Sequence, residues 1–168
     1  RAAETLLTDA RRVWGLDARI VRIFNTYGPR MAFADGRVVS SFIVQALEGR
    51  PLTLFGDGQQ TRSFCYVDDL IEGVVRVARL PSLEGPLNLG NPAEFTVEAL
   101  ARLVLELTGS TAALTFRPLP GDDPKLRRPD IGRARELVGF EPAVTLRKGL
   151  LRTIADFRAR LDPASAAP

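Results

Sequence analysis

The chain has 168 residues, 45% of them hydrophobic and 26% charged, with a formal net charge of +3 at pH 7. A chain of this length can bury roughly 70% of the surface that it exposes when unfolded, which is enough for one self-sufficient core. The sequence contains no histidine and a single cysteine, Cys65. These counts exclude histidine-based catalytic triads, histidine-zinc hydrolase sites and an internal disulfide, and we expect no metal site.

Hydropathy and the lone thiol bear on the location of the protein. No stretch approaches the roughly 20 apolar residues that a membrane span needs, and residues 1–5 lack the apolar core of a signal peptide. A single thiol is typical of a reducing compartment, so we expect a cytoplasmic protein without membrane contact. Cys65 lies in a strand-like run and is expected to be buried rather than nucleophilic.

The first predicted elements are a helix, a strand and a second helix. Apolar residues at helical spacing predict a helix over residues 1–14, and the Ile- and Val-rich run 18–24 predicts a buried strand. Glycine and proline then mark a loop. The following segment predicts a helix over residues 40–47, which Ser40 or Ser41 would cap.

Short strands and two capped helices follow. Residues 52–55 and 61–67 predict two strands joined by a glycine-containing turn. Asp68 is placed to cap a helix that runs to about residue 78. Residues 87–89 predict another strand, and Thr96 is placed to cap a strongly periodic helix that ends near residue 107.

The last third of the chain predicts one strand, one long loop and two helices. Residues 114–117 are a strand candidate, and residues 118–129 are too rich in Pro, Asp and Arg for regular structure. Helices are predicted near residues 131–137 and over residues 145–161. The Ala-, Pro- and Ser-rich tail, residues 162–168, is expected to be disordered.

These elements predict one mixed α/β domain over residues 1–161, with short mixed strands and packed helices. The sequence has no Gly-x-x-Gly-x-x-Gly turn after a first strand. Because that turn cradles the phosphates of a dinucleotide, these residues alone are not expected to hold one in the usual way. The chain also starts within a helical pattern and without an initiator methionine, so we expect an upstream segment.

Three arginine-bearing segments are candidates for anion binding. Two-residue alternation puts Arg62 on one strand face with Phe64 and Tyr66. Arg127 and Arg128 lie on a rigid loop, and residues 36–41 run from a glycine turn into a helix start. From the residues alone, each has two readings: a local role, such as pairing of Arg62 with Asp57, or contact with a diphosphate ligand.

Six motifs that occur in a fixed order along the chain are more specific than the three arginine-bearing segments. The motifs are Asn25-Thr26-Tyr27-Gly28-Pro29-Arg30-Met31, Asp35-Gly36-Arg37-Val38-Val39-Ser40, Gly56-Asp57-Gly58-Gln59-Gln60-Thr61-Arg62-Ser63-Phe64, Tyr66-Val67-Asp68-Asp69, Asn88-Leu89-Gly90-Asn91-Pro92 and Arg127-Arg128-Pro129-Asp130-Ile131. Over residues 1–158 the chain resembles the C-terminal half of UDP-glucuronate decarboxylases, which are extended short-chain dehydrogenases of the NAD-dependent epimerase/dehydratase family.

The resemblance implies the substrate-binding portion of a Rossmann-type fold, with NAD as the cofactor and a UDP-sugar as the substrate. It implies decarboxylation of UDP-glucuronate to UDP-xylose through a 4-keto intermediate. The N-terminal NAD-binding half and the catalytic Tyr-x-x-x-Lys of the family are absent from this sequence. By itself, this chain is expected to be inactive.

The resemblance also assigns roles to individual residues. The implied substrate-binding residues are Asn25, Ser41, Leu54, Phe55, Arg62 and Arg128, and Arg62 is also the implied catalytic residue within this chain. The implied cofactor-binding residues are Ile23, Thr26 and Arg37. Ser41 departs from the family, which commonly has asparagine there, so one substrate hydrogen bond is expected to change.

Several alternatives to this function remain open from the sequence. Within the family, a nucleotide-sugar 4,6-dehydratase or 4-epimerase would use the same arginines. From another class, a non-catalytic UDP-sugar-binding module fits if no Tyr-x-x-x-Lys precedes the chain. Nucleic-acid binding is disfavoured, because basic residues are not interleaved with aromatic ones. The helix over residues 1–14 resembles one through which the family forms homodimers.

Overall fold

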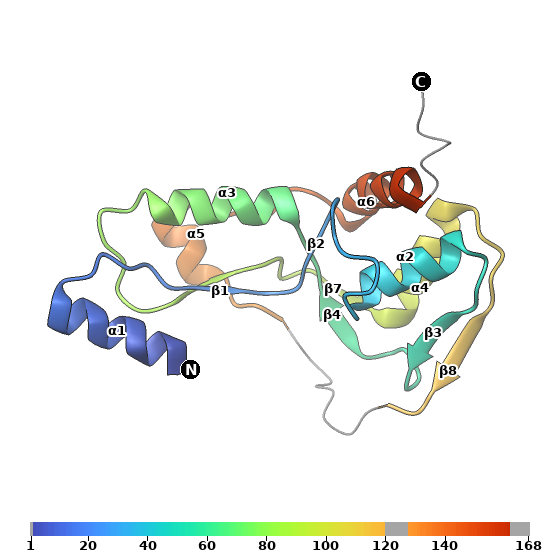
Figure 1. Cartoon of the computed structure of the whole chain (residues 1–168), viewed down its shortest axis with the longest axis horizontal. Helices are drawn as coiled ribbons and strands as arrows, with labels where there is room; N and C mark the ends of the chain where they lie inside the picture. Colours follow the sequence, from blue (N-terminus) through green and yellow to red (C-terminus); the bar gives the residue numbers. More distant parts are fainter. Residues whose placement is uncertain (1, 120–127, 162–168) are drawn as a thin grey trace.

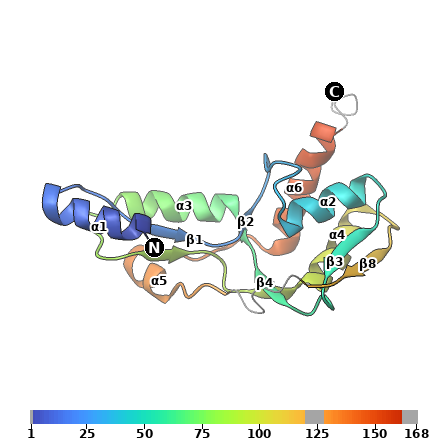
Figure 2. The same ribbon diagram turned by 60° about the horizontal axis from the view of Figure 1, so that its bottom comes forward.

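The computed structural model describes residues 2–119 and 128–161, and Figure 1 shows that they form an elongated molecule with two groups of elements. One group contains α1, α3 and α5, and the other contains α2, α4 and α6. Each group has its own cluster of buried apolar side chains. Short paired strands connect the two groups, and Figure 2 shows the same division from a second direction.

The first group is built on a parallel pair of strands. These are β1 (Val21–Ile23) and β6 (Leu87–Leu89), with Val21 opposite Leu87. The helices of this group are α1 (Ala2–Trp14), α3 (Val67–Ala78) and α5 (Gly132–Val138). Leu70 and Val77 of α3 pack with Leu87 and Leu89 in its core. The apolar stripe of α3 therefore faces the strand pair, as burial of apolar surface favours, whereas α1 contributes none of the described residues of this cluster.

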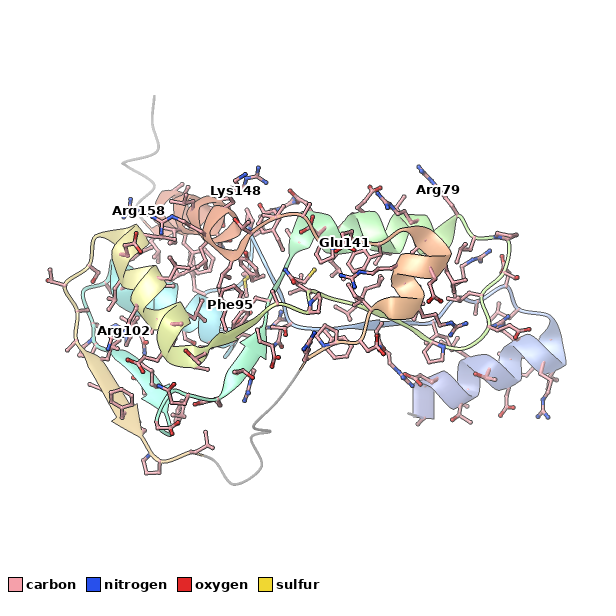
Figure 3. The ribbon with its side chains drawn as sticks, turned by 180° about the vertical axis from the view of Figure 1, so that it is seen from behind. Arg79, Phe95, Arg102, Glu141, Lys148 and Arg158 are labelled. Carbon is pink, nitrogen blue, oxygen red and sulfur yellow. The ribbon has the colours of Figure 1, made fainter. Side chains whose placement is uncertain are left out.

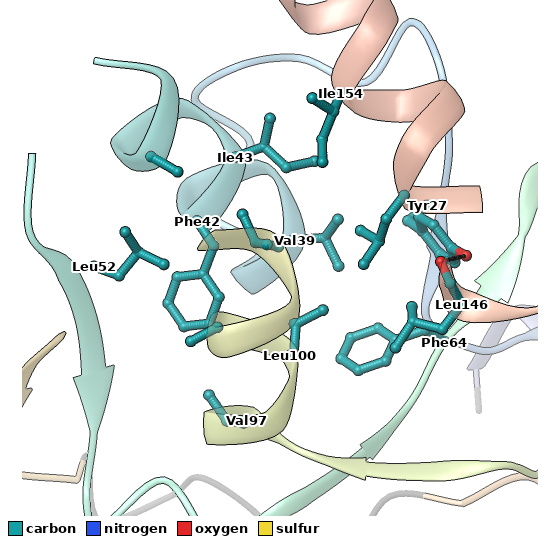
Figure 4. Close-up of a cluster of buried hydrophobic side chains, with 14 of the residues drawn as sticks. Tyr27, Val39, Phe42, Ile43, Leu52, Phe64, Val97, Leu100, Leu146 and Ile154 are labelled. Carbon is teal, nitrogen blue, oxygen red and sulfur yellow. Dashed lines mark hydrogen bonds between the residues drawn. The ribbon is translucent and has the colours of Figure 1, made fainter. Parts of the chain in front are cut away.

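The second group is built on β3 (Leu52–Phe55) and β8 (Leu114–Arg117), which pair in parallel with Leu52 opposite Leu114. Its helices are α2 (Val38–Leu47), α4 (Val97–Thr108) and α6 (Leu146–Leu161). Figure 4 shows Phe42, Leu52, Leu100 and Ile154 in its core, and the hydrogen bond from the Tyr27 hydroxyl to the Leu146 carbonyl. Charged side chains such as Arg79 and Lys148 lie on the outside (Figure 3).

Two strand pairs lie between the groups. β2 (Thr26–Tyr27) pairs in parallel with β5 (Cys65–Tyr66). β4 (Thr61–Ser63) pairs in an antiparallel manner with β7 (Glu94–Thr96), which places Arg62 opposite Phe95. These pairs join residues that are more than thirty positions apart in the sequence.

The structure confirms most of the predicted elements and corrects several of their ends. The strands at residues 52–55, 87–89 and 114–117 are confirmed without change. The single strand predicted over residues 61–67 is wrong, because Phe64 separates β4 from β5. The two strands predicted to flank the glycine turn pair with β8 and β7, not with each other. β2 and β7 were not predicted.

The predicted helix caps have mixed outcomes. Thr96 caps α4 as expected, since its hydroxyl accepts a hydrogen bond of 3.0 Å from the Ala99 amide. Capping by Ser40 or Ser41 is wrong, because α2 begins at Val38 with Arg37 at the cap position. Capping by Asp68 is also wrong, because α3 begins at Val67, so Asp68 lies inside the first turn.

Some predictions fall outside the residues that the structure describes. They are the disordered tail at residues 162–168, most of the loop at residues 118–129, and the anion-binding role of Arg127. Within the described part of the chain, no helix is both long and apolar enough to cross a bilayer.

Candidate functional site

A pocket of about 320 Å³ opens beside the second group of elements. Its walls come from the strand β2, the loop that follows it, the first turn of α2, the outer edge of β3 and the strand β4. The lining residues used below are Asn25, Thr26, Arg37, Ser41, Thr53, Phe55, Gln60 and Arg62. This volume lies within the usual range of small-molecule sites.

The charge of the pocket is positive. Among the described residues that line it, Arg37 and Arg62 are the charged ones. Arg62 is 8% exposed, whereas the Arg37 side chain is 59% exposed. A buried guanidinium keeps its charge, so its field in the pocket is screened less than that of a surface arginine. The pocket therefore favours anionic ligands.

Alternation along β4 explains why Arg62 reaches the pocket. Arg62 and Phe64 both line it, as the sequence predicted for residues on one strand face. The third predicted member, Tyr66, lies instead in the core on β5, where its ring is 5.7 Å from that of Tyr27. The Arg62 Nη1 donates a hydrogen bond of 2.7 Å to the Thr61 carbonyl.

The outer edge of β3 supplies one pocket wall. Leu52 and Leu54 point into the core, so Thr53 and Phe55 point the other way and line the pocket. The Gln60 side chain donates a hydrogen bond of 2.7 Å to the Phe55 carbonyl. Thr53 and Gln60 were not predicted as site residues. The same alternation that exposes Phe55 could have identified Thr53, whereas Gln60 had no such signal.

Arg37 forms the rim of the pocket. Its Nη1 donates a hydrogen bond of 3.1 Å to the Thr26 carbonyl, and its Nε lies 3.4 Å from an Asp35 carboxylate oxygen. Asp35 also accepts hydrogen bonds from the Arg37 amide and the Ser40 hydroxyl. Asp35 therefore fixes the turn that leads into α2, although no side chain of the described residues caps the helix itself.

The structure brings most of the predicted site residues together. Asn25, Thr26, Arg37, Ser41, Phe55 and Arg62 all line the pocket. The Leu54 side chain does not, because it is fully buried in the core. Ile23 does not line it either: it is 58% exposed on β1, two residues before Asn25.

Arg128 lies on a separate hollow formed with Pro129, Asp130 and Arg135, among others. Its Nη1 is 3.7 Å from the Glu94 Oε2, and the other carboxylate oxygen of Glu94 accepts a hydrogen bond of 2.8 Å from the Thr61 hydroxyl. Thr61 is the neighbour of Arg62 on β4. Glu94 therefore links Arg128 to the strand that carries Arg62.

Burial shifts two pKa values near the pocket. Desolvation raises the pKa of the Tyr27 hydroxyl well above its usual value, and that hydroxyl donates to the Leu146 carbonyl. Burial also raises the pKa of the Cys65 thiol to about 12. Neither group can release a proton near neutral pH, so Cys65 is buried and unreactive, as the sequence predicted.

Comparison with known proteins identifies close relatives. UDP-glucuronic acid decarboxylase 1 of Arabidopsis thaliana is 51% identical over 161 residues, which are 96% of this chain and 37% of the relative. UDP-glucuronic acid decarboxylase 1 of Xenopus tropicalis is 47% identical over 162 residues, or 96% of this chain and 38% of the relative. The chain thus spans less than half the length of these enzymes.

Solved structures share the fold. UDP-glucose 4-epimerase of Thermotoga maritima, solved with UDP-glucose, superposes with a TM-score of 0.89 at 32% identity, covering 95% of this chain and 52% of that one. UDP-glucuronic acid 4-epimerase of Bacillus cereus, solved with UDP-glucuronic acid and NAD, gives 0.86 at 29% identity, covering 94% and 50%. The α/β fold of the extended short-chain dehydrogenases, expected from the sequence, is confirmed.

A family model is the last of these comparisons. The model described as the NAD dependent epimerase/dehydratase family matches residues 1–90, more than half of the sequence. The relatives and solved structures agree with it in fold and in kind of enzyme. The chain therefore belongs to the NAD dependent epimerase/dehydratase family.

Proposed function

We propose that the protein is a UDP-glucuronate decarboxylase, which converts UDP-glucuronate to UDP-xylose and CO2, and that this chain forms its nucleotide-sugar-binding half. The observation that carries the proposal is the pocket of about 320 Å³ that two arginines, Arg37 and Arg62, line together with polar side chains such as Asn25 and Ser41. Its location in a chain that is about half identical to UDP-glucuronic acid decarboxylases supports this substrate class.

The proposed substrate is anionic, which suits a pocket lined by two arginines. UDP-glucuronate carries a diphosphate and a sugar carboxylate, and a guanidinium binds either group through two parallel hydrogen bonds. We assign Arg62 to the diphosphate or the sugar, and Arg128 to the diphosphate through its link to β4 by way of Glu94. Asn25 and Ser41 provide uncharged hydrogen-bonding groups in the same pocket as Arg62.

The uracil is assigned to the outer edge of β3. The Phe55 ring and the Thr53 side chain lie on this edge, and the backbone of Leu54 and Phe55 runs along it. An exposed strand edge offers amide and carbonyl groups that can pair with a base, and an aromatic ring offers it a stacking surface. The Leu54 side chain is buried, and its backbone groups share the side of β3 that pairs with β8, so the amide and carbonyl groups on the outer edge are those of Thr53 and Phe55.

NAD is the proposed cofactor, and the residues present fit one edge of it. The exposed Ile23 side chain offers an apolar surface to a flat ring, and Thr26 and Arg37 offer polar groups beside the pocket. The sequence holds no glycine-rich turn for the NAD phosphates, so these must be bound elsewhere. When bound, NAD supplies the oxidation and reduction of the sugar at C4.

This chain's own contribution to the reaction is binding and orientation. A ketone at C4 of the sugar makes the C6 carboxylate a β-keto acid, in which the C5–C6 bond breaks with loss of CO2. Arg62, fixed on β4 and shielded from water, holds the anionic substrate in place during this sequence. Arg37, more exposed at the rim, covers the pocket mouth.

The proposal is tested by incubating the complete protein with NAD and UDP-glucuronate, separating the nucleotide sugars by chromatography and weighing each by mass spectrometry. We expect UDP-xylose, which is lighter than the substrate by one CO2. A product of unchanged mass with the inverted sugar would indicate a 4-epimerase, as in the Bacillus cereus relative that was solved with this substrate. Binding without any conversion would indicate a non-catalytic UDP-sugar-binding module.

We also propose a cytoplasmic homodimer that forms through residues 1–14. The apolar side chains of Leu6, Val13 and Trp14 on α1 are largely exposed. An apolar helix face of this kind favours a partner helix, as in a helical bundle. Sedimentation of the complete protein tests this proposal, and a monomer at micromolar concentration would contradict it.

A further inference from the structure

The loop between β2 and α2, residues 28–37, forms part of the pocket wall and is named here the rim loop. It contributes Met31, Gly36 and Arg37 to the pocket lining. Asp35 anchors its second half through hydrogen bonds to the start of α2. The first half, which holds Met31, has no such anchor within the loop, and its contacts lead to a distant part of the chain.

Those contacts are made by α6, near the other end of the sequence. The rim loop passes beside this helix in both Figure 1 and Figure 2. The Arg30 amide donates a hydrogen bond of 2.9 Å to the Asp156 carboxylate, and Arg160 Nη2 donates one of 2.8 Å to the Met31 carbonyl. Two neighbouring residues of the loop, Arg30 and Met31, are thus held through their backbone by side chains that lie four residues apart on α6.

Asp156 and Arg160 also hold each other. Arg160 Nε donates to the same Asp156 oxygen at 2.9 Å, and the two side chains are only 21% and 34% exposed. The Arg160 guanidinium lies 4.3 Å from the centre of the Phe33 ring, which packs edge-on against Phe157 at 5.0 Å. A partly shielded ion pair with an aromatic contact is more rigid than an exposed pair.

The backbone of the rim loop shows why such an anchor is needed. Arg30 has a φ of 66°, and among the described residues it is the non-glycine residue with a positive φ. This left-handed conformation is unfavourable for a residue with a Cβ, so it persists only where surrounding contacts fix it. The hydrogen bonds to Asp156 and Arg160 flank this residue on either side.

We infer that Asp156 and Arg160 are positioning residues for the nucleotide-sugar pocket: they hold the strained first half of the rim loop, and with it Met31, in the shape that receives the ligand. The inference rests on the proposed function for the identity of that ligand. It assigns Arg160 no contact with the substrate, so its loss is expected to change binding more than turnover.

The first test needs no ligand and measures trypsin cleavage after Arg30, the arginine in the first half of the rim loop, by the mass of the released fragments. In Arg160→Ala we expect cleavage at this bond to become about tenfold faster, because a freed loop opens locally. The matched control is Arg158→Ala, on the same helix, which loses a comparable hydrogen bond of 2.7 Å to the Thr108 carbonyl. Equal cleavage rates in wild type and Arg160→Ala would overturn the inference.

The second test measures steady-state kinetics of the complete protein with UDP-glucuronate. In Arg160→Ala we expect KM to rise about tenfold with kcat within about twofold. The ligand must then order the loop when it binds, and this cost weakens binding without changing the bound complex. Asp156→Asn keeps the shape and is expected to give a smaller rise. Unchanged KM in both variants, or an equal rise in Arg158→Ala, would contradict a positioning role.

The two proposals can fail separately. If the wild-type protein does not convert UDP-glucuronate, the proposed function is wrong, and the affinity for UDP measured by calorimetry replaces KM in the second test. An Arg160→Ala variant that then binds UDP as tightly as wild type overturns the positioning role. Faster cleavage after Arg30 together with weaker UDP binding supports it.

Discussion

Arg62 is the residue on which the site depends most. It is buried beside a pocket, on a strand whose alternation turns it away from Ser63 and toward the cavity. A buried cation is costly to desolvate unless hydrogen bonds and anions compensate it. The Thr61 carbonyl accepts one of its hydrogen bonds, and the remaining donors of the guanidinium include those proposed to bind the ligand.

The variant Arg62→Ala is expected to lose about 1.5–3 kcal/mol of substrate binding or transition-state stabilisation, the usual contribution of a charge-assisted hydrogen bond. The measurement is kcat/KM of the complete protein with UDP-glucuronate. Arg62→Lys is the matched control and should recover only part of the loss, because an ammonium cannot bind two oxygens in parallel. Unchanged kinetics in Arg62→Ala would remove this residue from the site.

Cys65 gives a pH prediction. The thiol has an ordinary pKa of 9.0 and a folded-state pKa of about 12. Between these values the unfolded chain has released the proton and the folded chain retains it, so stability is complete below pH 9 and falls as pH rises toward 12. The slope from this group is at most about 1.4 kcal/mol per pH unit.

The check on Cys65 is urea unfolding at several pH values from about 8 to about 10.5, in wild type and in Cys65→Ala. We expect the free energy of unfolding to fall more steeply with pH in the wild type, because the variant lacks the titrating thiol. Parallel slopes would mean that the thiol titrates alike in the folded and unfolded states. That result would contradict a raised pKa of Cys65 in the folded protein.

The sequence alone predicted which residues line the pocket better than it predicted whether each contributes its side chain or its backbone. Asn25, Ser41 and Arg62 could be predicted because strand alternation and motif resemblance fix their side of the chain. The burial of the Leu54 side chain and the exposure of the Ile23 side chain could not be predicted. They depend on which face of β3 or β1 is covered by elements that are remote in the sequence. Gln60 was missed since its hydrogen bond to Phe55 crosses a turn.

At the scale of elements, local chemistry was predictable and remote pairing was not. The cap of α4 was correct because Thr96 and the Ala99 amide are three residues apart. β2 and β7 have two and three residues, and each exists only because a strand far away in the sequence pairs with it. No pattern within such short segments predicts them.

The α4 cap provides the prediction at this scale. Thr96→Ala removes the acceptor for the Ala99 amide and is expected to cost about 1 kcal/mol of stability, whereas Thr96→Ser keeps it and should cost much less. Urea unfolding of the two variants makes the comparison. If both lose stability equally, the methyl group of Thr96 and not its hydroxyl stabilises the helix.

For the molecule as a whole, the pocket's charge predicts how ligand binding responds to salt. The affinity for UDP should weaken severalfold between about 0.05 M and about 0.5 M NaCl, because exposed charges are screened more than buried ones. Arg37 is the exposed member of the pair and Arg62 the buried one. Calorimetry on Arg37→Ala should therefore show the weaker salt dependence, and Arg62→Ala the greater loss of affinity. The reverse order would contradict the electrostatic account of the pocket.

The placement of the two core clusters also belongs to this scale. The strands that line the pocket lie between the cluster built on α2, α4 and α6 and the one built on α3 and α5. The site is therefore built on the second group and the strands beside it: β4 carries Arg62, Asn25 directly precedes β2, and α6 contacts the rim loop. The sequence patterns predict the elements of each group, but they do not predict which remote elements contact one another.

The most direct measurement is a crystal structure of the complete protein with UDP-xylose, the expected product, which occupies the site without reacting further. The account predicts the nucleotide in the pocket of Arg62, with the diphosphate or sugar bonded to this guanidinium and the uracil on the outer edge of β3. A nucleotide bound elsewhere, or bound there without contact to Arg62, would contradict the assignment of this pocket.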